Sequence, residues 1–251
     1  MIKVIMHGCN GAMGQTITRL IAKDPQIEIA AGIDKYTGIS NTYPVFTSLS
    51  ECTEDADVII DFSNASAVDD LLDFAESKKM PVVLCTTGLS QEQLDRMKKV
   101  SETTAILKSA NMSLGVNLLM KLLKEAAPIL AASAFDIEVV EKHHNQKVDA
   151  PSGTALALAD AINEEFDGAY EYVYDRTVRR EKRRSKEIGI SAVRGGTIVG
   201  DHDVIFAGED EVITFSHRAY SKAVFGNGAI AAARFLAGKG PGLYEMKDVV
   251  L

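Results

Sequence analysis

Two histidines, a lysine and a hydroxyl-bearing turn lie together in residues 141–154. His143 and His144 are followed by Lys147, and the turn Pro-Ser-Gly-Thr ends at Thr154. An alanine-rich run comes next, so a helix should begin at this turn with a hydroxyl group as its cap. The free N–H groups of a helix start attract an anion, and a histidine can donate a proton near neutral pH. The segment therefore predicts a site for a small anion, such as a carboxylate, beside a proton donor.

Two other interpretations of this segment stay open from the residues alone. The histidines could belong to a structural loop that binds no ligand. They could also bind a metal ion, but adjacent residues on a strand point to opposite faces, so both could reach one ion only from a loop. The neighbouring residues offer no cysteine or further histidine, and Lys147 would repel a cation.

The elements on either side should hold these side chains in place. Phe135, Ile137 and Val139 alternate with polar residues, as in a half-buried strand. Residues 155–165 are rich in alanine and should be helical. The expected order is therefore strand, cationic loop and helix start.

A glycine-rich turn near the N-terminus predicts a second binding site. Residues 2–7 form a short apolar strand, and residues 15–22 have a helical pattern. Between them Gly8, Gly11 and Gly14 are spaced as Gly-x-x-Gly-x-x-Gly, rather than the commoner Gly-x-Gly-x-x-Gly. Glycine lets a backbone approach a pyrophosphate and lets a helix pack closely on a strand. The pattern indicates a dinucleotide-binding turn.

An acidic residue at a suitable distance supports this interpretation. Asp34 follows the expected strand 27–33 and stands twenty residues after Gly14. A carboxylate there can accept hydrogen bonds from a ribose diol, whereas the adjacent Lys35 could meet a 2′-phosphate. NADH, NADPH or both are therefore possible cofactors, and Asp34 could alternatively be a simple turn residue.

Strands and helices continue to alternate through the first half, which is typical of a parallel sheet. The expected strands are 56–62, 81–87 and 105–109, and the expected helices are 65–77 and 90–101, the second with a capping box. Ligands of such sheets bind at the carboxyl ends of the strands. Four segments should therefore share one rim, namely residues 8–14, 62–63, 85–87 and 110–113. Cys85 on this rim could be a nucleophile, but buried free cysteine is common and no base accompanies it.

The second half has a different pattern. Residues 116–132 should form a long helix that Pro128 breaks or kinks. Expected strands at 187–194, 202–207 and 211–217 are separated by short turns, which suggests an antiparallel or mixed sheet of the kind that often forms a subunit interface. A helix over residues 223–237 should return to the first domain. Between Arg176 and Lys186 basic residues cluster, and we expect a solvated, mobile loop rather than a nucleic-acid site.

Composition bounds the remaining possibilities. The chain has 251 residues, 46% of them hydrophobic, which suits one large or two modest globular domains. The net charge of -8 disfavours general nucleic-acid binding and means that an anion site needs local cations. The three cysteines are odd in number and have no metal-like spacing, and we therefore expect a protein of the reducing cytoplasm. We see neither a signal peptide nor an apolar run long enough for a membrane span.

Several stretches together resemble one family, the 4-hydroxy-tetrahydrodipicolinate (dihydrodipicolinate) reductases. The most specific is Glu-Lys-His-His-Asn-Gln-Lys-Val-Asp-Ala-Pro-Ser-Gly-Thr at 141–154. The others are the glycine turn at 8–14, Thr-Thr-Gly at 86–88, Ala-Asn-Met-Ser at 110–113, Ala-Val-Arg-Gly-Gly at 192–196, 200–206 and 216–219. They occur in the expected order over essentially the whole chain.

The resemblance implies a fold and a domain organisation. The fold class would be α/β, a Rossmann-type doubly wound parallel sheet with an inserted α+β domain for substrate binding and oligomerisation. Residues 1–112 and 219–251 would form the dinucleotide-binding domain, and residues 113–218 the substrate-binding and tetramerisation domain.

The resemblance also implies roles for residues of this chain. His143 would be the catalytic acid and Lys147 the other proton donor, while His144 would bind substrate. Gly153 and Thr154 would hold a substrate carboxylate. The cofactor-binding positions would be Gly8, Cys9, Asn10, Gly11, Ala12, Met13, Asp34, Lys35, Cys85, Thr86, Thr87, Ala110, Asn111, Met112 and Ser113. The family usually has glycine in place of Cys85 and often phenylalanine in place of Met112.

The implied reaction is the reduction of 4-hydroxy-tetrahydrodipicolinate, a small cyclic dicarboxylate, to tetrahydrodipicolinate in lysine and diaminopimelate biosynthesis, with NADH or NADPH. We expect a cytoplasmic homotetramer that binds neither nucleic acid nor membrane and holds no metal. One alternative is another two-domain dehydrogenase that acts on an amino acid or a semialdehyde. A second, from a different class, is a dinucleotide sensor without enzymatic activity.

Overall fold

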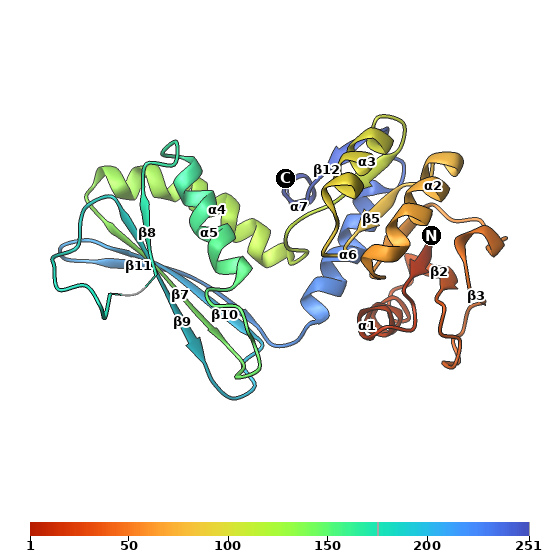
Figure 1. The fold of residues 1–251 in the computed structure, drawn as a ribbon, viewed down its shortest axis with the longest axis horizontal. Coiled ribbons are helices and arrows are strands. Elements are labelled where there is room, and N and C mark those ends of the chain that lie inside the picture. Colours follow the sequence, from red (N-terminus) through yellow and green to blue (C-terminus); the bar gives the residue numbers. More distant parts are fainter. Residues whose placement is uncertain (175, 251) are drawn as a thin grey trace. The chain divides into compact units, whose positions relative to one another are not determined.

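The computed structural model describes residues 1–174 and 176–250, which form two compact units. The first unit consists of Met1–Leu114 and Ala223–Leu251, and the second of Gly115–Lys222. The junctions follow residues 114 and 222, where the sequence suggested 112 and 218. Leu251, the last residue of the expected first domain, lies outside the described residues. Figure 1 shows both units.

The first unit is built on a parallel sheet of seven strands. The strands are β1 (Ile2–His7), β2 (Ile27–Ile33), β3 (Val45–Phe46), β4 (Val58–Asp61), β5 (Val82–Leu84), β6 (Ala105–Leu107) and β12 (Gly242–Tyr244). Their order across the sheet is β12-β6-β5-β4-β1-β2-β3, and every neighbouring pair is parallel. The order of strands reverses direction at β1, which is the switch point where doubly wound sheets bind ligands.

Helices cover both faces of this sheet because its strands are apolar on both faces. In β1, Val4 and Met6 join one core and Ile5 joins the other. Helices α1 (Ala12–Ile21), α6 (Ala223–Leu236) and α7 (Met246–Val249) contribute to the first core. Helices α2 (Val68–Lys78) and α3 (Gln91–Ser101) contribute to the second, with the short turns η1 (Leu49–Glu51) and η2 (Ala65–Ala67) nearby. The expected Rossmann-type sheet is confirmed, as is the capping box of α3 between Ser90 and Gln93.

The second unit has a mixed sheet of five strands, in the order β11-β10-β7-β9-β8. The strands are β7 (Asp136–His143), β8 (Glu171–Val173), β9 (Glu187–Arg194), β10 (Gly200–Ala207) and β11 (Val212–Ala219). Strand β10 is antiparallel to both of its neighbours, whereas β7, β9 and β8 are parallel. Helices α4 (Leu114–Ala132) and α5 (Gly153–Glu164) share one core with the sheet, and Figure 1 shows them beside it.

Two local expectations for the second unit need correction. Of the two effects expected of Pro128, a break or a kink, the break does not occur, because α4 continues through it to Ala132. The loop of basic residues is not simply solvated. Arg183 donates to Asp136 Oδ1 at 2.8 Å and to Glu138 Oε1 at 3.1 Å, and its side chain is only 17% exposed. The cluster therefore ties its loop to strand β7 by ion pairs.

Of the helices within residues 1–174 and 176–250, none combines the length and apolar character that a bilayer-spanning segment requires.

Candidate active site

The glycine turn after β1 has the close approaches that its sequence pattern predicts. Gly8 has φ +80°, a conformation that favours glycine, and a Cβ there would lie 2.5 Å from the Phe62 carbonyl oxygen. A Cβ on Gly14 would lie 2.2 Å from the carbonyl oxygen of Gly8. Gly11 occupies the N-cap of α1, and among the described residues no side chain caps this helix. The first N–H groups of α1 are therefore available to an anion.

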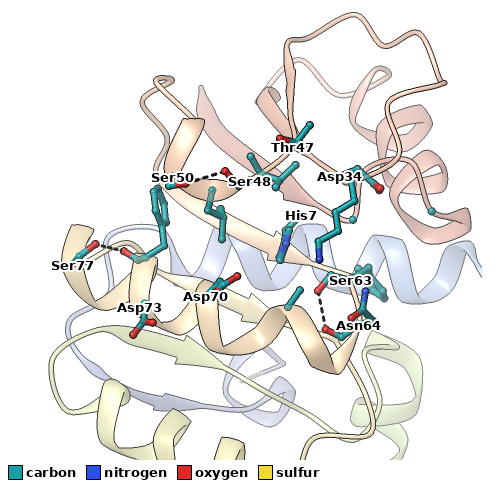
Figure 2. Close-up of a pocket in the computed structure, with 18 residues that line it drawn as sticks. His7, Asp34, Thr47, Ser48, Ser50, Ser63, Asn64, Asp70, Asp73 and Ser77 are labelled. Atoms are coloured by element: carbon teal, nitrogen blue, oxygen red, sulfur yellow. Dashed lines mark hydrogen bonds between the residues drawn. The ribbon is translucent and has the colours of Figure 1, made fainter.

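A cavity of about 740 Å³ opens at the carboxyl ends of β1, β2 and β4. Figure 2 shows its walls, with His7, Asp34 and Ser63 on the strand ends and Asp70, Asp73 and Ser77 on α2. Four of the predicted cofactor residues line it, namely Gly8, Gly11, Asp34 and Lys35. Thr47, Ser48 and Ser50 form another part of the wall and were not predicted from the sequence.

Asp34 is held by the backbone on both sides. Its Oδ2 accepts the N–H of Asn10 at 2.9 Å, and its Oδ1 accepts the N–H of Tyr36 at 2.9 Å. Asp34 therefore joins the glycine turn to the end of β2, and it faces the cavity beside Lys35. A carboxylate fixed in this way can still accept hydrogen bonds from a diol, because each oxygen has a second lone pair.

The side chains of two predicted cofactor residues are buried in the core instead. Cys9 has 0% exposure and Met112 has 5%, and both pack in the core beside α6. Burial, with Asp34 nearby, raises the pKa of the Cys9 thiol to about 12. These two positions could contact a cofactor through their backbone only, a limit that the sequence pattern did not reveal.

The other predicted cofactor residues lie near the ends of their elements. Ala12 and Met13 begin α1, residues 85–87 follow β5, and residues 110–113 lie between β6 and α4. None of these positions is among the described residues that line the 740 Å³ cavity. Burial, with Asp61 nearby, raises the pKa of Cys85 well above its usual value, so its thiol is not activated as a nucleophile.

A buried pair at the strand ends was not predicted. His7 Nδ1 lies 2.9 Å from Asp61 Oδ1, and the Asp61 side chain is fully buried. Ser63 donates its hydroxyl to the same oxygen at 2.6 Å. Burial alone would raise the pKa of Asp61, but the His7 ring and the hydroxyl groups of Ser63 and Thr86 hold it below its usual value. His7 also lines the cavity, so this pair supports its floor.

In the second unit, the register of the strands explains why polar side chains gather at one end of the sheet. Ile137 and Val139 of β7 pair with apolar residues on both neighbouring strands and lie in the core. The next residue on the same face of β7 is Glu141, which pairs with His202 of β10, and His202 pairs with His217 of β11. His143 follows on that face. The period of two that buries the apolar rows thus also buries this polar row, except for His217, which is half-buried.

Glu141 is the centre of the polar row. Its carboxylate is 0% exposed and receives both terminal nitrogens of Arg194, at 2.8 and 2.7 Å. It also accepts the backbone N–H of Ser152 at 3.0 Å and lies 2.6 Å from His143 Nδ1. Burial alone would raise the pKa of Glu141, but the hydrogen bonds from Arg194, His143 and Ser152 hold it below its usual value. Glu141 is therefore a buried carboxylate with every contact made by a donor.

Ser152 connects this row to helix α5. Its hydroxyl caps α5 by accepting the N–H of Ala155 at 3.2 Å, as the sequence suggested, and lies 3.1 Å from His202 Nε2. The rings of His143 and His202 meet edge to face at 5.1 Å between centroids. Burial, with His143 nearby, lowers the pKa of His202 to about 4, so His202 is neutral at pH 7.

The start of α5 leaves room for a ligand. A Cβ built on Gly153 would meet none of the described atoms beyond its chain neighbours within 4 Å. Thr154 follows in the first turn of the helix. Lys147, in the loop before it, donates to Asp149 Oδ1 at 2.8 Å, and this contact lowers the pKa of Asp149. The loop thus holds His144, Lys147 and the helix start within eleven residues, but Asp149 partly neutralises the lysine.

Metal binding has no matching side-chain arrangement in the part of the chain that the structure describes. No group of three or more His, Cys, Asp or Glu side chains there could hold an ion.

Comparison with known proteins identifies relatives over the whole chain. The family model described as "Dihydrodipicolinate reductase, N-terminus" matches residues 2–112, and "Dihydrodipicolinate reductase, C-terminus" matches residues 115–250. A 4-hydroxy-tetrahydrodipicolinate reductase of Caldanaerobacter subterraneus is 55% identical over 250 residues, which cover 100% of this chain and 98% of that protein. One from Clostridium novyi is 47% identical over 251 residues, with the same coverage.

Solved structures agree with this finding. Dipicolinate-bound dihydrodipicolinate reductase from Paenisporosarcina sp. TG-14 is similar with a TM-score of 0.82 and 26% identity, over 100% of both chains. A diaminopimelate dehydrogenase of C. glutamicum has a TM-score of 0.56 at 16% identity, over 98% of this chain and 93% of that one, and shares the fold alone.

Proposed function

The chain belongs to the dihydrodipicolinate reductase family, and we propose that it reduces 4-hydroxy-tetrahydrodipicolinate to tetrahydrodipicolinate with NADH or NADPH as the reductant. The observation that carries this proposal is the group of side chains around His143, beside the open start of α5. It combines a proton donor with an anion site in a protein whose other unit has a dinucleotide turn. A dinucleotide sensor without activity would need only the turn.

The first unit supplies the residues that would bind the cofactor. The turn from Gly8 to Met13 presents the uncapped start of α1 to a pyrophosphate, and Asp34 faces the cavity where a ribose would lie. Lys35 beside it would favour a 2′-phosphate. Segments 85–87 and 110–113 would approach the nicotinamide end. When bound, the reduced nicotinamide supplies a hydride to the substrate ring.

The second unit supplies the residues that would bind the substrate. A cyclic dicarboxylate carries two negative charges in a protein of net charge -8, so it needs local donors. The N–H groups of Gly153 and Thr154 would bind one carboxylate, and His144 and Lys147 would add positive charge. Charge-assisted hydrogen bonds of this kind contribute roughly 1.5–3 kcal/mol each.

His143 is the proposed proton donor, with Lys147 as the second candidate. Reduction of the ring leaves an electron pair that must take up a proton, and His143 presents its Nε2 for this step because its Nδ1 faces Glu141. Lys147 donates to Asp149 at 2.8 Å, and its ammonium group has two further N–H donors that could reach a substrate. General acid help of this type accelerates a reaction by roughly 10²–10⁴-fold.

The direct test is an initial-rate assay with substrate generated enzymatically in the cuvette. We expect oxidation of NADH or NADPH that depends on the cyclic substrate, and the ratio of the two rates gives the cofactor preference. Loss of either nucleotide at the same rate with and without substrate would contradict the proposed reaction.

The family resemblance also supports a homotetramer and a cytoplasmic location, which we include in the proposal. Light scattering coupled to size-exclusion chromatography should give about four times the 27.1 kDa chain mass. A mass of one chain at micromolar concentration would remove the tetramer from the proposal.

A further inference from the structure

We propose that Glu141 is a positioning residue that orients the proton donor and the substrate's carboxylate site with a single buried side chain. This inference rests on the proposed function, because it takes His143 as the proton donor and the start of α5 as the anion site. It adds a residue with no chemical step of its own, which acts through the groups it holds.

The contacts of Glu141 reach both parts of the site. One oxygen, Oε2, lies 2.6 Å from His143 Nδ1, and the other, Oε1, accepts the backbone N–H of Ser152 at 3.0 Å. Ser152 is the N-cap of α5, so the second contact fixes where the helix begins. The residues that follow it are Gly153 and Thr154. A shift of Glu141 would therefore move the proton donor and the helix start together.

The contact with Nδ1 selects one form of the imidazole. An ionised carboxylate can only accept hydrogen bonds, so Nδ1 must carry a proton. His143 is then left with Nε2 as the nitrogen that gains and loses the transferred proton. That nitrogen points toward Gly200, where an added Cβ would lie only 3.1 Å away. The ring thus has a defined orientation as well as a defined tautomer.

Arg194 makes the buried charge of Glu141 tolerable. Its guanidinium forms two parallel bonds to the carboxylate, at 2.8 and 2.7 Å, and this geometry is the strongest that the pair can adopt. Arg194 also donates to the carbonyl oxygen of Asp149 at 2.6 Å. The arginine therefore holds the loop between β7 and α5 against the same carboxylate, and the pair is neutral as a whole.

The groups that face His143 come from three strands and one helix start. Glu141 lies on its own strand, Arg194 on β9 and His202 on β10, with His217 of β11 one position further. Helix α5 contributes the uncharged Ser152. Because His202 is neutral at pH 7, the charged groups among these neighbours are Glu141 and Arg194.

The first test reads the tautomer in the unaltered protein and needs no activity. The chain has five histidines, so ¹⁵N-histidine labelling gives a simple ring spectrum, and the signals lost in His143→Gln identify His143. We expect neutral His143 to carry its proton on Nδ1, although free histidine prefers Nε2. A neutral ring protonated on Nε2 would overturn the proposal, whatever the protein's activity.

The second test changes the carboxylate to an amide. In Glu141→Gln the single carbonyl oxygen should accept from Arg194, which turns the NH₂ group toward His143 and reverses its tautomer. We expect kcat to fall by roughly 10²–10⁴-fold and KM for the cyclic substrate to rise, with Kd for NADH unchanged. A fall in kcat with an unreversed tautomer, or unchanged kcat and KM, would each overturn the proposal.

Glu138→Gln is the matched control. Glu138 lies on β7 three residues before Glu141, on the opposite face, where it pairs with Arg183. The same chemical change there should leave kcat, KM and the His143 tautomer unchanged. If Glu141→Gln does not fold, the spectrum of the unaltered protein still decides the matter. If the cyclic substrate is not reduced at all, the proposed function fails, while the tautomer can still be confirmed.

Discussion

His143 differs from the neighbouring His202 in its hydrogen-bond partner. Its Nδ1 faces a fully buried carboxylate, whereas His202 contacts a serine hydroxyl and is neutral at pH 7. The sequence alone pointed to His143 through the motif that contains it. The role of Glu141 could have been inferred from alternation, since it stands two residues before His143 on a strand whose buried face was already predicted.

Replacing His143 should separate chemistry from cofactor binding. In His143→Gln we expect kcat to fall by roughly 10²–10⁴-fold, because the proton must then come from water or Lys147. The dinucleotide turn lies in the other unit and is unchanged, so Kd for NADH, measured by calorimetry, should stay within about twofold of its original value. A variant with full turnover would remove His143 from the role of proton donor.

Lys35 should affect one cofactor more than the other. Its ammonium group lines the cavity beside Asp34 and would meet a 2′-phosphate, which NADPH has and NADH lacks. In Lys35→Ala we expect KM for NADPH to rise by about tenfold, which corresponds to about 1.4 kcal/mol, and KM for NADH to change little. Equal changes for both nucleotides would show that Lys35 does not contact the phosphate.

Cys85 should be dispensable for the chemistry. Burial raises the pKa of its thiol, so at pH 7 it is not the thiolate that a semialdehyde dehydrogenase of the acylating kind requires. Cys85→Ala should retain at least about half of kcat, because it changes the local packing only slightly and removes no reacting group. A loss of about 10³-fold, the scale of a lost nucleophile, would favour that competing enzyme class.

At the scale of elements, two N-caps offer a matched comparison. Ser152 caps α5 beside the proposed site, and Ser90 caps α3 in the other unit. Each change to alanine should lower the free energy of unfolding by about 1 kcal/mol, as measured by urea denaturation. Only Ser152→Ala should also raise KM for the cyclic substrate, because α5 supplies the carboxylate site. A similar rise in Ser90→Ala would mean that the effect reports general stability.

The long elements and the short strands β5 and β6 could be predicted from the sequence, and three other short strands could not. Strands 2–7 and 27–33 have the expected bounds because runs of mainly apolar residues mark strands that are buried on both faces. Strands β3, β8 and β12 have only two or three residues each, too few for any period to appear. The glycine turn was predicted from its spacing. The inward direction of Cys9 and Met112 depends on tertiary packing, which no local pattern records.

The arginine cluster shows a second limit of local patterns. Residues 176–186 have the composition of a solvated loop, yet Arg183 bonds to two carboxylates and two carbonyl groups of the neighbouring strands. The partners on β7 lie 45 to 47 residues before Arg183 in the sequence. Long-range pairing of this kind is invisible to a sequence window.

For the whole molecule, buried carboxylates should determine stability in acid. Asp61 in the first unit and Glu141 in the second both have pKa values below their usual values. Such groups contribute stability above the pKa of the unfolded chain, about 3.9 for Asp and 4.3 for Glu, and lose it as the pH falls through the lower folded value. We expect the free energy of unfolding to decrease as the pH falls from about 5 to 3.

Asp61→Asn tests how much Asp61, in the first unit, contributes to the loss of stability in acid. The amide cannot be protonated in this range, so the variant should be less stable at pH 7 and lose less of its remaining stability between pH 5 and 3. Urea denaturation at each pH gives both values. A variant with the same acid dependence as the unaltered protein would assign that dependence to other groups.

The most direct measurement for the account as a whole is a crystal structure with a reduced nicotinamide cofactor and pyridine-2,6-dicarboxylate. We predict that one carboxylate lies on the N–H groups of Gly153 and Thr154, with His143 Nε2 within hydrogen-bond reach of the ring and Nδ1 still on Glu141. A dicarboxylate bound elsewhere, with the His143 imidazole far from its ring, would contradict the account.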